Sequence, residues 1–282
     1  MKHNRNSATI RNPFARWATT MAALLVLASG AGAQQAGIQG IILQRDGQRI
    51  PSAGAGVIRW LPAREAYIIT ADGVRLEIPL RQVDEVRTAK PRQFDAAENA
   101  VRTRRYAPAI PVLEKIVTDY RRLQWDIPAA RLLTQAYMGM GNPAEAAKKA
   151  EVAISGNPDV WQDMEFARLY WDALSKSGQS GRLGRILLQG IEHGSRETAA
   201  AAQIMRGNID FDQGRYRDAL VDGYLRTIML FRDVKQVQPE ALYRAVRAHE
   251  QLGEHSHAEK FKKMLLSDYP QSSYSKDLRS GS

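Results

Sequence analysis

The chain has 282 residues, of which 44% are hydrophobic and 25% are charged. This length suits about two domains, and the balance is that of an ordinary folded protein. A chain disordered throughout and a multi-pass membrane protein are both excluded. Because the sequence contains no cysteine, disulfides, thiolate zinc sites, cysteine nucleophiles and lipid-modified cysteines are excluded as well.

The first 33 residues have the pattern of a secretory signal. Four Lys and Arg residues and no acidic residue precede the apolar run 21–28, and the small residues that follow end in an Ala-x-Ala pattern at Ala33. We expect cleavage between Ala33 and Gln34. The alternative is a retained membrane anchor, but the apolar run is far shorter than the ~20 residues of a spanning helix. Export without cysteine predicts the periplasm of a Gram-negative bacterium.

The charge balance argues against a nucleic-acid partner. The formal net charge is +10, and removing the four cations of the signal leaves 36 Lys and Arg against 30 Asp and Glu, or +6. Both signs are mixed along the chain, and export separates the protein from nucleic acid.

Residues 34–90 are predicted to form a small β domain. Short apolar runs with a period near two are separated by turn residues, and the dipeptides at 46–47 and 72–73 are Asp-Gly. Asp-Gly readily takes the positive φ of tight turns, so two hairpins are expected. The pattern resembles SH3-like or Sla1-homology-like modules and predicts four or five strands in a meander or SH3-like barrel. Trp60 and Tyr67 are expected to cover its core, the alternative being stacking on a ligand.

A repeat begins near Pro91. Gly141, Gly178, Gly214 and Gly253 lie 37, 36 and 39 residues apart, each between two helical stretches, and a further step of 37 back from Gly141 reaches Arg104. The residues five positions after these anchors are mostly small: Ala109, Ala146, Leu183, Ala219 and Ala258. The period predicts about five helix-turn-helix units over residues 91–275, followed by a flexible tail at 276–282.

These residues resemble the tetratricopeptide repeat (TPR). In that family small residues let two antiparallel helices approach closely, a glycine turns between them, and a proline such as Pro158 or Pro270 ends the second helix. The resemblance covers about 190 of the 282 residues. It is poorest in the third unit, where Leu183 replaces the small residue. It implies a mainly α protein, a right-handed α-solenoid of about five TPR-like helix pairs preceded by the small β module.

The last two units are similar to the envelope branch of this family, which includes the Tol-Pal coordinator and the outer-membrane assembly lipoproteins. The segment Tyr269-Pro270-Gln271-Ser272 matches a short peptide that follows the last helix there. The resemblance implies a protein-binding scaffold of the cell envelope, accessory to a TolQ/ExbB-like or outer-membrane assembly system. A lipid anchor is not implied, because no lipobox cysteine exists.

Motifs for catalysis are missing from the sequence. It has no G-x-S-x-G, H-E-x-x-H or P-loop, so we expect no enzyme and no cofactor. After the signal, the histidines are His193, His249, His255 and His257. We interpret them as solvated turn residues, since His255 and His257 should point to different sides, and we expect no metal site.

The resemblance also suggests where a partner binds. In this repeat the first helix of each pair lines the concave surface, and residues two, three, six, ten and thirteen before the turn point into it. The positions six and ten before each anchor are Glu98 and Phe94, Gln135 and Arg131, Asp172 and Arg168, Asn208 and Ile204, and Arg247 and Tyr243. The predicted partner-binding residues are Arg131, Gln135, Arg168, Asp172, Asn208, Tyr243 and Arg247.

Arginine forks and amides at these positions suit an extended peptide or an acidic tail, because they bond carboxylates and backbone carbonyls. The alternative for any one of them is the polar face of an amphipathic helix. A rival function is the binding of cell-wall glycan or peptide by the β module or the groove.

The signal hypothesis is tested by N-terminal sequencing of the exported protein. We expect the mature chain to begin at Gln34. A chain that keeps Met1 and fractionates with the membrane would show that the segment is an anchor.

Overall fold

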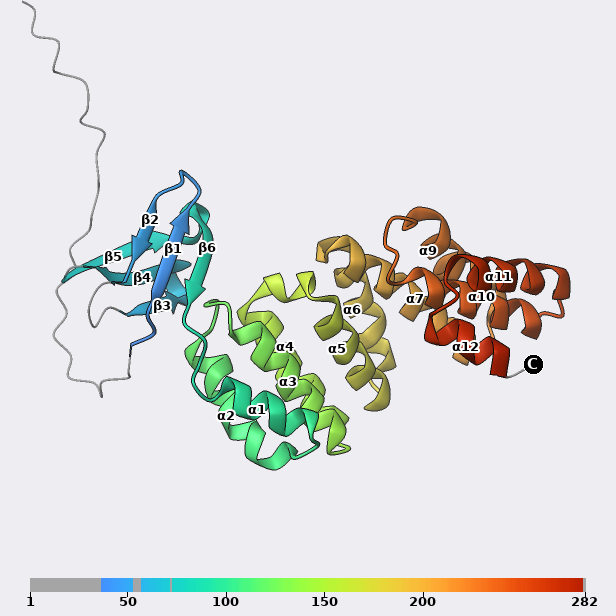
Figure 1. Cartoon of the computed structure of the whole chain (residues 1–282), viewed down its shortest axis with the longest axis horizontal. Coiled ribbons are helices and arrows are strands. Elements are labelled where there is room, and N and C mark those ends of the chain that lie inside the picture. The colour runs from blue at the N-terminus through green and yellow to red at the C-terminus, as the bar shows by residue number, and fades with distance from the viewer. Residues whose placement is uncertain (1–36, 53–56, 72, 281–282) are drawn as a thin grey trace, which may run out of the picture.

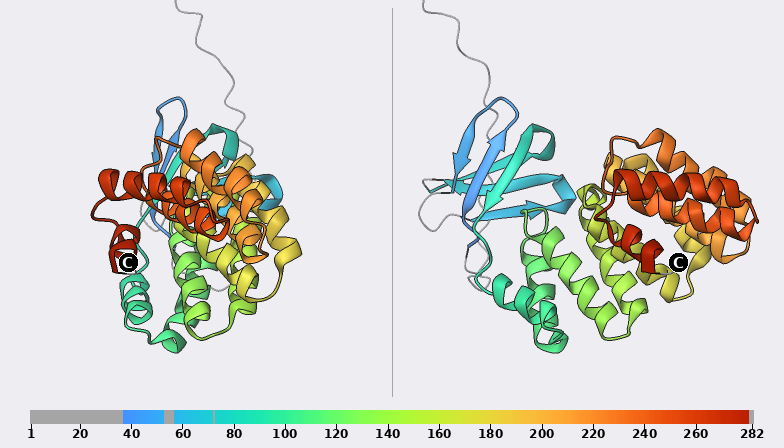
Figure 2. Two further views of the ribbon diagram at one scale, coloured as in Figure 1. Left: turned by 90° about the vertical axis from the view of Figure 1, so that its right-hand side faces the viewer. Right: turned by 45° about the vertical axis from the view of Figure 1, so that its right-hand side comes forward.

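The computed structural model describes residues 37–52, 57–71 and 73–280, so the predicted signal lies outside the described residues. The described chain has two parts, a β module and a row of helices that leads away from it to the C-terminus (Figure 1). The β module lies at one end of this row in a second view as well (Figure 2, right). Within the described residues, no helix is both long and apolar enough to cross a membrane.

The β module contains two separate antiparallel sheets of three strands, ordered β2-β1-β6 and β3-β4-β5. The strands are β1 (Gly40–Gln44), β2 (Arg49–Pro51), β3 (Ile58–Leu61), β4 (Ala66–Ala71), β5 (Val74–Pro79) and β6 (Val83–Thr88). Gly47 (φ 87°) and Gly73 (φ 78°) take positive φ in the β1–β2 and β4–β5 hairpins, which confirms both predicted hairpins.

The predicted barrel is wrong, because the two sheets do not close on each other. After β5 the chain crosses through a short 3-10 turn (η2, Leu80–Gln82), and β6 then pairs with β1 rather than continuing the β5 edge. The hydrogen-bonded ladders therefore stay within each sheet. Apolar side chains between the sheets form the core, including Ile42, Ile58 and Ile69.

The aromatic pair of the β module lies at its contact with the helices. The Trp60 and Tyr67 rings are 4.9 Å apart, and the Arg122 guanidinium lies 4.9 Å from the Trp60 ring centre. The Tyr67 hydroxyl donates a hydrogen bond of 3.1 Å to the Arg122 carbonyl. These contacts show structural packing, as expected for this pair.

The loop between the first two helix pairs joins the solenoid to the β module. Leu123 in this loop is only 1% exposed and belongs to the core of the β module. Its neighbours Arg122 (φ 55°) and Gln124 (φ 80°) both take left-handed backbone conformations. Thr88 Oγ1 donates to the Leu123 carbonyl at 2.8 Å, and the Trp125 indole donates to the Thr88 carbonyl at 3.3 Å. The loop thus inserts an apolar side chain and fixes the end of β6.

Five helical hairpins follow, as the repeat predicts. Units one to three pair α1 (Phe94–Arg102) with α2 (Tyr106–Asp119), α3 (Asp126–Gly139) with α4 (Pro143–Gly156), and α5 (Met164–Lys176) with α6 (Ser180–His193). Unit four pairs α7 (Arg196–Asp212) with a helix made of α8 (Tyr216–Asp218), the π-helical η4 (Ala219–Tyr224) and α9 (Leu225–Leu230). Unit five pairs α10 (Gln238–Gln251) with α11 (His255–Asp268).

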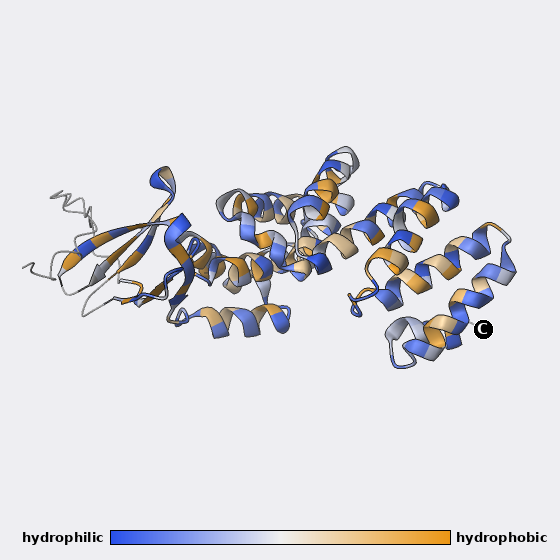
Figure 3. Cartoon of the chain, turned by 90° about the horizontal axis from the view of Figure 1, so that it is seen from above, coloured by the Kyte–Doolittle hydropathy of each residue, from blue (hydrophilic) through white to orange (hydrophobic). Residues whose placement is uncertain are grey.

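The turns of the hairpins lie at the predicted anchors. The four anchor glycines have φ between 71° and 75°, and Arg104 takes the same left-handed conformation at φ 60°. All five residues that follow them by five positions are buried, including Leu183 in the third unit. The hydropathy colouring shows the helices with one hydrophobic and one hydrophilic side (Figure 3). The repeat alignment is therefore confirmed, its weakest unit included.

In units three and four, a large side chain on one helix of the pair faces a glycine on the other helix. In unit three, a Cβ on Gly190 of α6 would lie 2.9 Å from the Trp171 ring of α5. In unit four, Gly223 of the π-helix lies against Gly207 of α7, and Tyr224 is fully buried beside them. A bulky residue on one helix is thus matched by glycine on the other, which keeps the helices close.

Residues 276–280 are helical where the sequence predicted a flexible tail over 276–282. Helix α12 (Ser273–Ser280) begins with the Ser272 side chain accepting the Ser275 backbone N–H at 3.1 Å. The buried Ser275 hydroxyl donates to the Tyr269 carbonyl at 2.7 Å, and the Tyr274 ring lies 5.3 Å from that of Tyr243. This N-cap and ring contact order residues that look polar in the sequence.

The first helices of the units form the inner surface of the solenoid. Helices α1, α3, α5, α7 and α10 pack on one another in succession, whereas the second helices α2, α4 and α6 contact one another marginally at most. Neighbouring units are therefore closer together on the side of the first helices than on the side of the second helices.

The helix contact in unit two is tested by Ala146→Leu. Ala146 is fully buried, so the larger side chain should overpack the contact and lower the free energy of unfolding by about 1–3 kcal/mol. The matched control is Ala144→Leu, the same change at an exposed position of α4. Equal melting temperatures for the two variants would contradict the packing described here.

Candidate functional site

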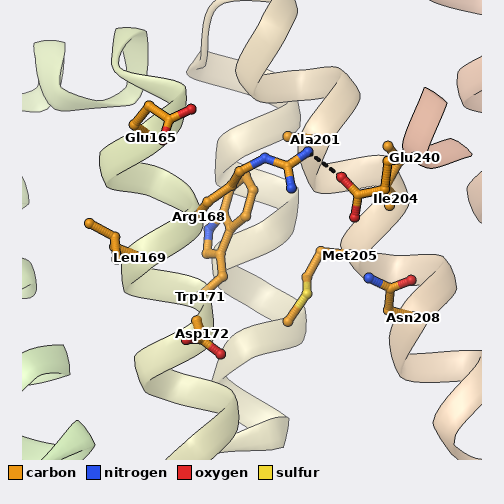
Figure 4. Close-up of a pocket in the computed structure, with 10 residues that line it drawn as sticks. All are labelled: Glu165, Arg168, Leu169, Trp171, Asp172, Ala201, Ile204, Met205, Asn208 and Glu240. Carbon is orange, nitrogen blue, oxygen red and sulfur yellow. Dashed lines mark hydrogen bonds and ion pairs between the residues drawn. The ribbon is translucent and has the colours of Figure 1, made fainter. Parts of the chain in front are cut away.

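A pocket of about 340 Å³ opens between α5, α7 and α10, the first helices of units three to five (Figure 4). Its lining residues are Glu165, Arg168, Leu169, Trp171, Asp172, Ala201, Ile204, Met205, Asn208 and Glu240. Three predicted partner-binding residues, Arg168, Asp172 and Asn208, thus meet at one place.

The pocket combines an apolar lining with charged and amide groups. Trp171 and Ile204 are buried, and Leu169 and Met205 are half-buried. The Asn208 amide is oriented by the Tyr224 hydroxyl, which donates to its Oδ1 at 3.0 Å. Asn208 therefore keeps its amide nitrogen as a donor beside an apolar wall.

An ion pair spans the pocket. Arg168 of α5 donates to Glu240 of α10 at 2.8 Å, and the side chains are 34% and 10% exposed. The pair links unit three to unit five across α7. Tyr274 of α12 lies near the same charges, and burial, with a smaller contribution from Glu240, raises the pKa of its hydroxyl.

The predicted arginines do not form a row of unpaired guanidinium groups. Arg131 lies 3.6 Å from Asp163, and Arg247 lies 3.1 Å from Glu250 on its own helix. Since Arg168 is paired with Glu240, an acidic tail would have to displace a carboxylate at each of the three. The structure therefore does not favour the acidic ligand that the sequence suggested.

The residues that line the pocket carry a net negative charge. Three carboxylates, Glu165, Asp172 and Glu240, line it together with one guanidinium, that of Arg168. Asp172 also pairs with the exposed Lys176 at 2.8 Å. The exposed Glu165 has no ion pair among the described residues. A cationic group is the better electrostatic match.

The other predicted residues lie outside this pocket. Gln135 and Arg247 are exposed on α3 and α10, and Arg131 is half-buried on α3. Tyr243 packs on Tyr274 of α12 rather than lining the pocket. Of the remaining counted positions, Phe94 is buried against Trp125, 5.1 Å between rings, and so belongs to the core.

The sequence analysis did not predict the acidic residues of the pocket. The inward-facing positions that it counts back from each turn do include them. Glu165, Ala201 and Glu240 each stand thirteen residues before a turn glycine, and all three line the pocket. The sequence prediction rests on positions six and ten before the turn alone. Leu169 and Met205, nine before their turns, fall outside that register.

Comparison with known proteins shows distant similarity only. No protein-family model and no curated protein matches the chain. Among solved structures, one of MamA has 18% identity over 62% of this chain and 94% of its own, with a TM-score of 0.47. A Podosopora anserina putative kinesin light chain with TPR-like repeats has 14% identity over 64% and 95%, with a TM-score of 0.48. The helical-repeat description therefore rests on the five hairpins of this chain.

A double-mutant cycle on Arg168→Met and Glu240→Gln tests the ion pair. Because Glu240 is nearly buried, we expect a coupling free energy of about 1–2 kcal/mol from urea unfolding. The control cycle uses the exposed Lys176 and Asp172, for which about 0.3–0.5 kcal/mol is expected. Similar coupling in both cycles would show that Arg168 and Glu240 do not lock units three and five together.

Proposed function

We propose that this protein is an exported scaffold that binds an extended segment of a partner protein along the first helices of its solenoid. The observation that carries the proposal is the pocket between α5, α7 and α10, where residues from three units meet. A row of stacked helix pairs offers a long surface rather than a deep cavity, which suits an extended peptide.

The chemistry of the pocket points to a basic side chain of the partner. Lysine and arginine have an apolar stem and a cationic end. The stem matches Leu169 and Met205, and the charge matches Glu165, whose carboxylate has no ion pair among the described residues. The Asn208 amide nitrogen can donate to a backbone carbonyl of the peptide.

The proposed compartment is the periplasm. Its support is the basic, apolar and small-residue pattern of residues 1–33 and the similarity of the last units to envelope TPR proteins. An accessory role beside a TolQ/ExbB-like or outer-membrane assembly system is the corresponding proposal for the partner system. It rests on resemblance alone.

The rival function, glycan binding by the β module, has no supporting observation in the described residues. Tyr67 is buried, and the Arg122 guanidinium lies over Trp60. These rings therefore serve the contact with the solenoid.

The proposal is tested by selecting displayed random peptides on the full chain. We expect enriched peptides that carry Lys or Arg next to apolar residues. Asp172→Lys should weaken the selected peptides at least about tenfold, or 1.4 kcal/mol, because it brings a cation to the cationic end of the ligand. The matched control is Glu192→Lys, the same charge change on the exposed side of α6. Equal affinity for both variants, with unchanged melting temperatures, would remove the pocket as the binding site.

A further inference from the structure

Two histidines and a glutamate meet at the turn between α10 and α11, away from the residues that line the pocket. His249 is in the last turn of α10, Glu254 precedes α11, and His257 is in the first turn of α11. Gly253 (φ 71°) reverses the chain between them, and the Glu254 N–H bonds the His249 carbonyl at 2.9 Å. The sequence analysis predicts separate, solvated histidines. In the structure the turn brings the rings of His249 and His257 together.

The possible ligand atoms of the three side chains converge. One atom from each of His249, Glu254 and His257 lies within 4.8 Å of the other two. His249 Nδ1 is 2.7 Å from Glu254 Oε2, and the two imidazole rings are 5.2 Å apart and nearly parallel, at 18°. Ligand atoms on a tetrahedral zinc ion lie roughly 3.3 Å apart for bonds of 2.0–2.1 Å. The partly exposed Glu254 side chain must move back slightly from His249 Nδ1, and a rotation of the exposed His257 side chain brings in the third ligand.

His249 is held rigidly and has unused bonding capacity. It is only 6% exposed, and the Phe261 ring lies parallel to it at 9° with centres 5.4 Å apart. Its Nε2 atom is buried and has no hydrogen-bond partner in the described part of the chain. The nitrogen that faces Glu254 is the other one, Nδ1. The packing on Phe261 therefore preorganises Nδ1 beside the carboxylate as the ligand atom of this imidazole.

The carboxylate of the cluster is accessible to a cation, because the Glu254 side chain is 33% exposed. Arg217 of α8 lies 3.7 Å from Glu254, but its side chain is 80% exposed and can move into solvent. The guanidinium therefore does not block the site.

We propose that His249, Glu254 and His257 bind a divalent transition-metal ion. Two imidazoles and one carboxylate suit Zn²⁺, and also Ni²⁺, Co²⁺ or Cu²⁺, better than the oxygen-seeking Mg²⁺ or Ca²⁺. Three protein ligands leave at least one coordination position for water or for a group from a partner. Because the ligands come from both helices of unit five, the ion links α10 to α11 across their turn.

The test is calorimetric titration of the untagged, chelator-treated full chain with ZnCl₂ and, separately, NiCl₂. We expect one equivalent to bind and the melting temperature to rise with metal. His257→Ala should weaken binding at least about tenfold, since even residues that only orient metal ligands contribute 10–100-fold. His257 is exposed, so this variant should fold like the wild type. Melting curves without metal check this.

The matched control is His255→Ala, two residues away in the same first turn of α11 and outside the cluster. Its zinc affinity should equal that of the wild type, while Glu254→Gln should bind more weakly. The proposal is overturned if wild type binds neither metal, if His257→Ala binds as tightly as wild type, or if His255→Ala loses as much affinity as His257→Ala. The titration needs no partner peptide, so its result is independent of the proposed scaffold function.

Discussion

The close contact between the two helices of each hairpin is the constraint on which the rest of the structure depends. Each hairpin reverses at a residue with left-handed backbone, and the side chain five positions later is buried between the helices. Glycine takes this backbone conformation without strain, and alanine lets two helices approach closely. Where bulky residues occur, as at Trp171 and Tyr224, a glycine on the facing helix makes room for them. Stacking of such hairpins puts the first helices on one side and thereby creates the surface that holds the pocket.

The pocket contains an ion pair that connects two units of the solenoid. Its Arg168–Glu240 pair links two units that are not neighbours in the row, so side chains that connect the units also line the candidate site. The pairing also bears on the proposed ligand. A guanidinium that already has a carboxylate partner attracts an acidic peptide weakly, and the acids around it favour a basic one. At the other end of the row, Leu123 joins the first two units to the β module through a shared core.

The repeat could be predicted from the sequence because its signal is local and periodic. Glycine spacing located four turns and, by extension, the turn at Arg104, and Asp-Gly pairs located two β-hairpins. Features that depend on contacts between distant residues could not be predicted. They include the pairing of β6 with β1, which leaves the sheets open, the capture of Leu123 by the β module, and the π-helix that seats Gly223 on Gly207. The candidate site was predicted in part, since the register located Arg168, Asp172 and Asn208 but could not show that Glu240 pairs with Arg168.

The central claim is that the inner surface formed by α5, α7 and α10 binds a partner segment. Site-specific photocrosslinking in intact cells of the host tests it most directly. A crosslinker placed at Met205, in the pocket, should trap a discrete partner species, and addition of a selected basic peptide should reduce that species. The same crosslinker at Val152, which is exposed on α4, should trap none. A partner trapped at Val152 and absent at Met205 would contradict the account and place recognition on the outer face of the solenoid.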